Sequence, residues 1–277
     1  MILADSSANP DNHVNPVKNS VNISACLITL NEERNLPRCL ASVAPLVDEI
    51  VVVDSGSTDA TIKRAQEFGA RVIYQPWLGY VGQKNYALAH ATHPWVLSID
   101  ADEEISQTLG DAIRRIKNDT ARATSGAPAG YLVSRLVFYR NKWIRHGDWY
   151  PDRLVRLFQR DKARFTGGRV HEKLELDGEF FTLPGHLHHF TYANARARAE
   201  RIARYAELWA QSAHEEHRRA GPLSPQLHAA ARFLKGYLLK RGFLDGPIGW
   251  DIAAGNAREA WLKYTLLREL NRAAQTK

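Results

Sequence analysis

Cysteine is scarce in this chain, and long apolar runs are missing from it. Only Cys26 and Cys39 occur among 277 residues, without the Cys-x-x-Cys spacing or the second pair that a zinc cluster needs. We therefore expect two buried structural thiols in a reducing, cytoplasmic compartment. No apolar stretch approaches the roughly 18 residues of a membrane-spanning helix. Residues 1–20 are polar and lack the apolar core of a signal peptide, so we expect a disordered lead-in there.

Internal repeats and low-complexity tracts are also absent. Hydrophobic residues make up 44% of the chain and charged residues 24%, a balance typical of soluble globular proteins and not of disordered or fibrous ones. The charge is unevenly placed: residues 1–190 carry 22 basic and 22 acidic side chains, whereas residues 191–277 carry 15 and 8. We expect this basic third to face something anionic, which leaves nucleic acid, an anionic membrane surface and a phosphorylated substrate as alternatives.

From residue 22, short β-branched runs alternate with helix-like stretches, a pattern that predicts βαβ units and a parallel sheet. The predicted strands cover residues 22–30, 49–56, 71–76 and 94–100, with helices at 35–47, 58–70 and 79–92 between them. After a helix near 106–118, the alternating segments at 130–140, 153–160 and 170–176 predict antiparallel or mixed strands, and the chain turns helical from about 193. The expected fold class is therefore α/β, with a mixed central sheet in residues 21–190 and a basic helical segment in residues 191–277.

Polar residues that follow the predicted parallel strands are the candidates for ligand binding, because ligands of open parallel sheets bind beyond the carboxyl ends of the strands. These residues are Thr29, Asn31 and Glu32 after the first strand, Asp54 after the second, and Asp100 and Asp102 after the fourth. In an extended chain, Asp100 and Asp102 lie on one side and present two carboxylates to one cation. A Mg²⁺ or Mn²⁺ ion shared with a diphosphate fits such a pair. The structural alternatives are a solvated turn at Asp100 and helix capping near Asp54.

Taken together, the segments LITLNEERNLPRCLASV, EIVVVDSGSTDAT, GQKNYALAHA and VLSIDADEE resemble family-two glycosyltransferases over residues 22–110. The resemblance implies a Rossmann-like glycosyltransferase A fold, a nucleotide-sugar donor, a divalent cation and inversion at the anomeric carbon. It further implies roles for six residues. Thr29, Asn31, Glu32 and Asp54 would hold the nucleoside, while Asp100 and Asp102 would hold the ribose, the metal and the diphosphate.

Three later segments extend the resemblance to most of the chain. RLVRLFQRDKARFTGGRVHEKL, LPGHLHHFTY and FLKGYLLKRGFLDGPIGWDIA are similar to lipopolysaccharide-core β-1,4-glucosyltransferases. That subgroup implies UDP-glucose as the donor and a heptose of the lipid A–core as the acceptor. It also divides the catalytic domain into a donor half at about 21–110 and an acceptor half at about 111–190. A lipid-linked glycan or a protein remains an alternative acceptor.

An inverting transfer needs a base for the acceptor hydroxyl and positive charge near the leaving diphosphate. We expect Lys84, with the metal on Asp102, to supply the positive charge, although Lys84 could also be a solvated surface lysine. Glu172 is the expected base, since it lies past the donor half, beside His171, in a strand-like stretch; the resemblance points to the same position. An ordinary exposed glutamate is the structural alternative for Glu172. Glu103 and Glu104, beside the acidic pair, are the alternative bases.

The sequence says less about the roles of the remaining polar candidates. A zinc site at His186, His188 and His189 is not expected, because no third ligand has the right context. Arg153 and Arg156 could contact phosphate, but their spacing of three fits neither strand alternation nor helical periodicity with certainty.

The stretch 226–241 reads as an amphipathic basic helix, which either packs on the catalytic domain or lies on anionic lipid. The loop FLDGPIGW has no role that the sequence reveals. A nucleotidyltransferase would need a glycine-rich phosphate loop, which LITLNEERN lacks. Nucleic acid is not an expected partner, because no known nucleic-acid-binding motif accompanies the basic residues.

Overall fold

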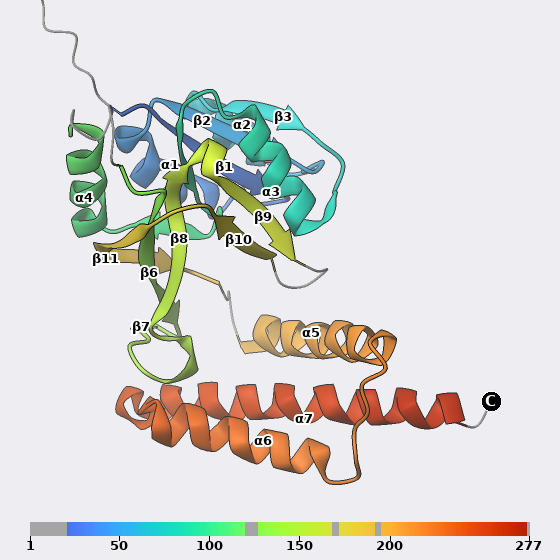
Figure 1. The fold of residues 1–277 in the computed structure, drawn as a ribbon. Helices are drawn as coiled ribbons and strands as arrows, with labels where there is room; N and C mark the ends of the chain where they lie inside the picture. The colour runs from blue at the N-terminus through green and yellow to red at the C-terminus, as the bar shows by residue number, and fades with distance from the viewer. Residues whose placement is uncertain (1–20, 120–126, 168–171, 192–194, 276–277) are drawn as a thin grey trace, which may run out of the picture.

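The computed structural model describes residues 21–119, 127–167, 172–191 and 195–275. The predicted lead-in over residues 1–20 lies outside these ranges, and so does His171. Within them, a body built on a β-sheet is followed by three helices that lie beneath it in Figure 1. The predicted order, a mixed α/β domain and then a helical segment, is confirmed.

Four parallel strands form the first half of the main sheet, in the spatial order β3-β2-β1-β4. They are β1 (Ile23–Thr29), β2 (Glu49–Asp54), β3 (Arg71–Tyr74) and β4 (Trp95–Ser98), and the helices α1 (Leu36–Val43), α2 (Thr61–Glu67) and α3 (Gly79–His90) connect them. Every one of these elements falls within a predicted segment. Parallel strands are covered on both faces and therefore need nearly continuous apolar runs, which is why the sequence reveals them clearly.

The second half of the sheet is mixed and continues in the order β8-β6-β11-β5. Its strands are β5 (Glu103–Ile105), β6 (Gly130–Tyr139), β8 (Asp152–Gln159) and β11 (Phe180–His189), with β7 (Lys142–Trp143) paired to β6. Strand β8 is antiparallel to both β4 and β6, whereas β11 is parallel to β6. Strands β9 (Ala163–Gly167) and β10 (Glu172–Leu176) form a separate antiparallel ribbon.

Helices and the ribbon cover opposite faces of the parallel strands. On one face, α1 and α4 (Gln107–Lys117) bury Leu36, Leu40 and Ile113 against the sheet. On the other face, α3 and the ribbon pack against the sheet, and Phe165 of β9 is part of that second core. The ribbon is therefore held directly over α3. This packing positions β10, the strand that follows β9 in the ribbon.

One extra residue interrupts the pairing of β8 with β6. Leu157 pairs with Tyr131 and Val155 pairs with Leu132, so Arg156 between them has no partner in the ladder. Such a β-bulge turns a side chain away from the regular alternation and is common beside active sites. The bulge explains why the spacing of Arg153 and Arg156 did not predict the direction of either side chain.

The C-terminal region is helical, as predicted, and its described residues form three α-helices. They are α5 (Ala195–Glu215), α6 (Ser224–Leu234) and α7 (Pro247–Gln275). Two details of the prediction were wrong. The stretch 226–241 is not one regular helix, because α6 gives way to a π-helical turn at Lys235–Leu239. FLDGPIGW is only partly a loop, since α7 already begins at Pro247, where a proline loses no helical hydrogen bond.

The acidic residue of FLDGPIGW, Asp245, joins the helical region to the sheet domain. The Asp245 side chain is buried and accepts hydrogen bonds from the backbone N–H groups of Arg145 (3.1 Å) and His146 (2.9 Å). Nearby, the Tyr139 hydroxyl donates to Asp251 of α7 at 3.0 Å. These contacts give the loop a structural role that the sequence did not reveal.

Both cysteines are buried and unpaired, as predicted. Burial, assisted by the charge of Glu49, raises the pKa of Cys26 to about 12, so this thiol is unreactive at neutral pH. Across the described residues, no helix combines the length and the apolar character that crossing a bilayer requires.

Candidate active site

The carboxyl end of β2 is organised by Asp54. Its side chain is fully buried, where one oxygen accepts from the backbone N–H groups of Gly56 (2.9 Å) and Ser57 (2.7 Å). The other oxygen accepts from the hydroxyl groups of Thr29 (2.8 Å) and Ser57 (2.6 Å). Asp54 and Thr29 therefore shape the loop that follows the strand, and their contact with a nucleoside stays a prediction.

The loop after β1 is fastened to the loop after β2. Asn31 has a left-handed φ of 57°, its side-chain oxygen accepts from the Thr58 N–H at 2.9 Å, and its own N–H donates to Ser57 at 2.8 Å. The Glu32 N–H donates to the Thr61 hydroxyl at 2.7 Å. Burial raises the pKa of Glu32 despite a hydrogen bond from Asn35, and the nearby charges of Asp102, Asp59 and Asp100 raise it further. Glu32 thus lies close to Asp100 and Asp102. The sequence predicted that the polar residues following the strands meet at one edge of the sheet.

The acidic pair lies in a turn and not in an extended chain, which corrects the basis of its prediction. The Glu103 N–H donates to the carbonyl of Asp100 at 3.0 Å and closes the turn. Because the chain reverses here, the two carboxylates face different partners. Asp100 meets Lys84 and Arg156, whereas Asp102 meets a histidine.

Lys84 connects Asp100 to Glu172. The ammonium nitrogen lies 3.1 Å from Asp100 Oδ1 and 3.0 Å from Glu172 Oε1, and the lysine side chain is only 7% exposed. Lys84 is therefore a buried cation and not a solvated surface lysine. Next to it on α3, Asn85 exchanges two hydrogen bonds with the backbone of Phe165, at 2.8 and 2.9 Å. This pair of bonds fixes the ribbon that carries Glu172 against the helix that carries Lys84.

Arg156, the residue of the β-bulge, is the second buried cation of the site. It lies 2.8 Å from Asp100 Oδ2 and 2.6 Å from Glu103 Oε1, with 7% of its side chain exposed. Burial alone would raise the pKa of Asp100, but the charges of Arg156 and Lys84 hold it well below its usual value. Asp100 is therefore a firmly ionised carboxylate between two cations.

Of the alternative bases, Glu103 differs from Glu172 in accessibility and Glu104 differs from it in its partner. The Glu103 side chain is fully buried, and it contacts Arg156 and Arg135. Burial raises the pKa of Glu103 even though Arg156 opposes the shift. The Glu104 side chain is 34% exposed, 3.9 Å from Arg38. Glu172, at 30% exposure, combines access with a direct contact to Lys84.

His189 lies against Asp102, a contact that the sequence analysis missed. Its Nε2 atom is 3.1 Å from Asp102 Oδ2, with the two side chains 10% and 25% exposed. The contact arises because β11 pairs with β5, which places His189 opposite Glu103. The other two histidines face elsewhere: His186 contacts the Tyr150 hydroxyl and His188 packs on Trp143. In the described part of the chain, no three histidine, cysteine or acidic side chains form a metal cluster.

Asp102 and His189 fit a divalent cation that is completed by a ligand. One carboxylate oxygen and one ring nitrogen already point at each other, and Mg²⁺ or Mn²⁺ commonly takes its other ligands from substrate phosphates and water. The imidazole is more compatible with Mn²⁺ than with the harder Mg²⁺. The donor set is compatible with the predicted cation at Asp102, but the cation itself stays a prediction, and so does Asp100 as a metal ligand.

Comparison with known proteins identifies the family and the fold of this chain. A family model described as glycosyl transferase family 2 matches residues 24–184. An uncharacterized glycosyltransferase of Rickettsia typhi is 30% identical over 258 residues, which cover 90% of this chain and 87% of that protein. The chain belongs to glycosyltransferase family 2. The predicted family is thus confirmed, and the acidic turn, Lys84 and Glu172 lie in the part of the chain that the family model spans.

Two further relatives of this family-2 glycosyltransferase are informative. LpsC, a lipopolysaccharide core biosynthesis glycosyltransferase of Rhizobium meliloti, is 35% identical over 162 residues, or 56% of this chain and 58% of that protein. The structure of the mannosyltransferase PcManGT from Pyrobaculum calidifontis, in complex with GDP-Man and Mn²⁺, superposes with a TM-score of 0.52 at 17% identity, over 90% of this chain and 87% of that one. The second match shows the fold, and the predicted glycosyltransferase A fold is confirmed.

Proposed function

We propose that this family-2 glycosyltransferase moves a hexose, glucose, from a UDP-sugar to a glycan of the cell envelope, with inversion at the anomeric carbon. The observation that carries the proposal is the contact of Glu172 with Lys84 and of Lys84 with Asp100. It joins a candidate base to the acidic turn where the donor diphosphate is expected. The two buried, unpaired cysteines fit a reaction in the cytoplasm.

Glu172 would take the proton of the acceptor hydroxyl while that oxygen attacks the anomeric carbon. The bond between this carbon and the diphosphate oxygen breaks as the new glycosidic bond forms, so the configuration inverts and UDP leaves. Lys84 holds the Glu172 carboxylate in place through its 3.0 Å contact. Asp100, held between two cations, is positioned to accept a hydrogen bond from the ribose.

Positive charge is needed where the diphosphate leaves. A Mn²⁺ or Mg²⁺ ion held by Asp102 and His189 would neutralise part of the charge on the diphosphate oxygens. Thr29, Asn31, Glu32 and Asp54 belong to the two fastened loops at the same edge of the sheet, where the nucleoside would bind.

The acceptor is proposed from relatives and not from geometry. LpsC of Rhizobium meliloti carries the description lipopolysaccharide core biosynthesis glycosyltransferase, and the later segments of this chain resemble the same group of enzymes. We therefore place the acceptor hydroxyl on a heptose of the lipopolysaccharide core. A lipid-linked glycan or a protein acceptor would use the same base and donor site.

A donor panel tests the proposal. Purified protein is incubated with Mn²⁺ or Mg²⁺ and with UDP-, GDP-, CMP- and ADP-sugars, and thermal stability and slow hydrolysis of the donor are followed. Metal-dependent stabilisation by UDP-glucose supports the donor assignment, and transfer to isolated lipopolysaccharide core then tests the acceptor. Stabilisation by GDP-sugars alone would contradict the UDP assignment, and no response to any nucleotide would contradict the transferase site itself.

A further inference from the structure

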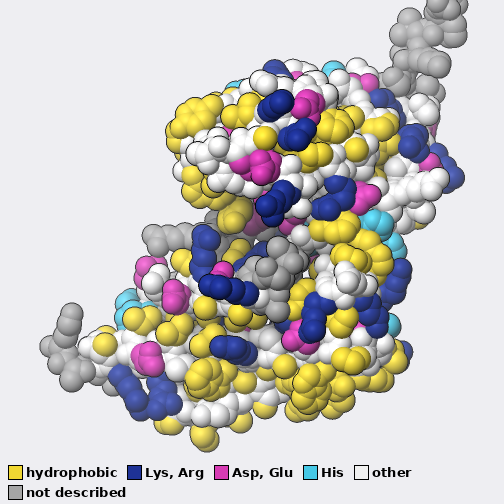
Figure 2. All heavy atoms as spheres, turned by 180° about the vertical axis from the view of Figure 1, so that it is seen from behind, with side chains coloured by type: hydrophobic (Ala, Val, Ile, Leu, Met, Phe, Trp, Pro, Cys, Tyr) yellow, Lys and Arg dark blue, Asp and Glu magenta, His cyan; other side chains and the backbone are white. Residues whose placement is uncertain are grey.

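A group of apolar side chains is exposed where α6 turns into α7. We call residues 234–250 the apolar elbow; it contains the π-helical turn, a short 3₁₀ turn at Gly242–Asp245 and the first residues of α7. The exposed side chains are Leu234 (50%), Leu238 (50%), Leu239 (80%), Phe243 (45%), Leu244 (52%) and Trp250 (54%). Figure 2 shows hydrophobic side chains gathered along the lower edge of the molecule, over the helical region. A soluble surface rarely exposes so many large apolar groups together.

The aromatic rings of this surface are held in place by one another. Tyr237 stacks on Phe233 at 5.3 Å and meets Trp250 edge-on at 5.3 Å. Phe243 meets Tyr237 edge-on at 6.2 Å. The rings form a fixed apolar platform with the leucines exposed around it, which resembles the apolar face of proteins that dip into the boundary between lipid headgroups and acyl chains.

The charges around the apolar elbow are almost all positive. Lys235 and Arg241 are exposed within it. Arg232 and Lys240, 46% and 44% exposed, lie beside them, and each forms an ion pair at 3.2 Å with the buried Asp148. Asp245 is the single carboxylate between residues 232 and 250, and it is buried with both of its described backbone partners in the catalytic domain. The surface therefore offers apolar groups and cations to solvent without an exposed acid among them.

We propose that the apolar elbow docks this enzyme on an anionic phospholipid bilayer. The leucines and rings would enter the headgroup boundary, and Lys235 and Arg241 would meet the lipid phosphates. Charge complementarity favours this occupant: a second copy of the chain would bring the same cations against one another, whereas an anionic leaflet neutralises them. If this stretch only packed on the catalytic domain, its leucines would be buried, but they remain half or more exposed.

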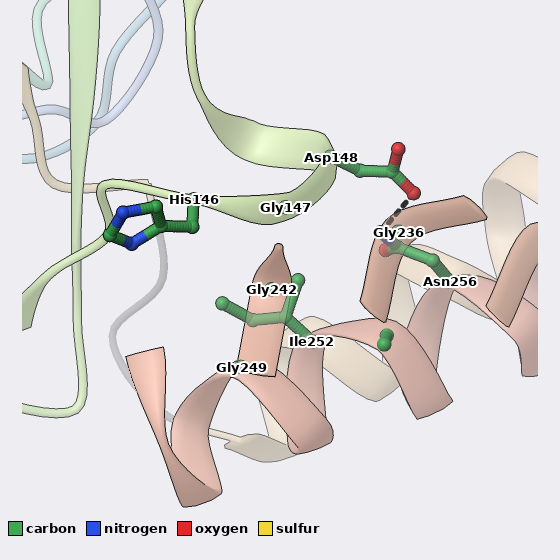
Figure 3. Close-up of a pocket in the computed structure, with 9 residues that line it drawn as sticks. His146, Gly147, Asp148, Gly236, Gly242, Gly249, Ile252 and Asn256 are labelled. Atoms are coloured by element: carbon green, nitrogen blue, oxygen red, sulfur yellow. Dashed lines mark hydrogen bonds between the residues drawn. The ribbon is translucent and has the colours of Figure 1, made fainter. Parts of the chain in front are cut away.

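The junction behind the elbow fixes its orientation to the catalytic domain. Figure 3 shows Gly147 and Asp148 of the catalytic domain beside Gly236, Gly242 and Gly249 of the helical region. A Cβ atom on Gly242 would lie 2.7 Å from the carbonyl oxygen of Gly236, and one on Gly236 would lie 2.8 Å from the side-chain oxygen Oδ2 of Asp148, so neither position has room for a side chain. A bilayer bound at the elbow would thus be held at a set orientation to the acceptor half.

Cosedimentation with vesicles tests the proposal. We compare vesicles of mixed phosphatidylglycerol and phosphatidylcholine with vesicles of phosphatidylcholine alone, at low and high salt. The full chain is expected to sediment with the anionic vesicles, and high salt is expected to weaken the binding. Lys235→Glu/Arg241→Glu and, separately, Leu238→Ser/Leu239→Ser/Leu244→Ser are each expected to lower partitioning by at least about tenfold.

Matched controls alter equally exposed groups elsewhere. Phe180→Ser/Phe181→Ser changes side chains of β11 that are 50% and 57% exposed, and Arg115→Glu changes an exposed charge on α4; both variants are expected to bind like the parent. Circular dichroism and donor binding confirm that each variant is folded. Vesicle binding does not require the proposed sugar or acceptor, so its failure is separable from failure of the transfer reaction.

Three results would overturn the proposal. The first is no sedimentation with anionic vesicles at low salt. The second is equal binding to neutral and to anionic vesicles, with no loss of binding in the Lys235→Glu/Arg241→Glu variant. The third is a dimer in light scattering that the leucine variant dissolves, without vesicle binding, which would make the elbow an interface between two copies.

Discussion

Lys84 Nζ lies 3.0 Å from Glu172 Oε1, although 88 residues separate the two in the sequence. The contact joins helix α3 to the β9–β10 ribbon. Because Lys84 also contacts Asp100, one buried ammonium group holds a carboxylate of the acidic turn and a carboxylate of the ribbon.

Glu172→Gln is expected to lower transfer by at least about 100-fold, because the amide cannot take the proton of the acceptor hydroxyl. Affinity for the UDP-sugar should stay close to that of the parent, since Asp100 retains both of its cations. Turnover and calorimetric donor binding measure the two effects. Glu175→Gln on the same strand, which is exposed, serves as the control and should keep its turnover. Near-normal turnover of Glu172→Gln would exclude Glu172 as the base.

Asp102→Ala and His189→Ala are each expected to weaken Mn²⁺ binding by about tenfold or more, since each removes one of the two proposed protein ligands. Mn²⁺ binding in the presence of UDP is followed by electron paramagnetic resonance, a readout that does not require transfer. His188→Ala alters a neighbouring residue that packs on Trp143, and it should bind Mn²⁺ normally. Equal affinity of all three variants would remove Asp102 and His189 from the metal site.

Glu49 makes stability depend on pH. Burial alone would raise its pKa, but hydrogen bonds from Arg71, Ser24 and Thr92 lower it to about 2. A carboxyl whose pKa is lowered on folding stabilises the protein above its unfolded pKa of about 4.3, and this contribution fades as the pH falls towards 2. Glu49→Gln should therefore lower the free energy of unfolding by about 2 kcal/mol at neutral pH.

The difference between parent and Glu49→Gln should shrink as the pH falls below about 4, because the parent then carries a neutral carboxyl too. Urea denaturation at several pH values measures it. Glu67→Gln removes an exposed partner of Arg64 and should change stability by less than about 1 kcal/mol throughout. A pH-independent deficit in Glu49→Gln would show that packing, and not ionisation, is what the substitution disturbs.

Gly249→Ala should destabilise the packing within the apolar elbow by at least about 2 kcal/mol. The added methyl group would overlap the carbonyl oxygen of Gly242, which is backbone and cannot swing aside. Gly110→Ala is the opposite case, since its methyl group would meet Leu46 at an ordinary 3.7 Å inside helix α4. That variant should be as stable as the parent or gain up to about 1 kcal/mol, as thermal unfolding would show.

The parallel half of the fold was predictable because its determinants are local. Buried strands such as β1 and β2 are continuous apolar runs, and the polar residues that follow them must meet at one edge of the sheet. That rule alone predicts that Thr29, Asp54 and Asp100 lie at the same edge of the sheet. The extended conformation expected at Asp100 was wrong, because a hydrogen bond between Glu103 and Asp100 closes a turn there, which the sequence analysis gave only as the structural alternative.

Non-local pairing accounts for what the sequence did not predict. His189 meets Asp102 only because β11 pairs with β5, a strand of three residues that is too short to recognise. Arg156 points into the site because a bulge interrupts the alternation of β8. Lys84 is buried because the ribbon covers α3. The residue pattern of the helix does not indicate that another element packs on this face.

The predicted division into donor and acceptor halves would run through one sheet and not between two separable bodies. Strand β4 needs β8 as its neighbour, and β5, only five residues after β4, crosses to the far edge of the sheet to pair with β11. A truncated polypeptide ending near residue 110 would keep the four parallel strands β1 to β4, yet it would leave β4 as a bare hydrophobic edge and β5 without a partner. During synthesis, the acidic turn between these two strands can therefore take its final form only after β11 has emerged from the ribosome.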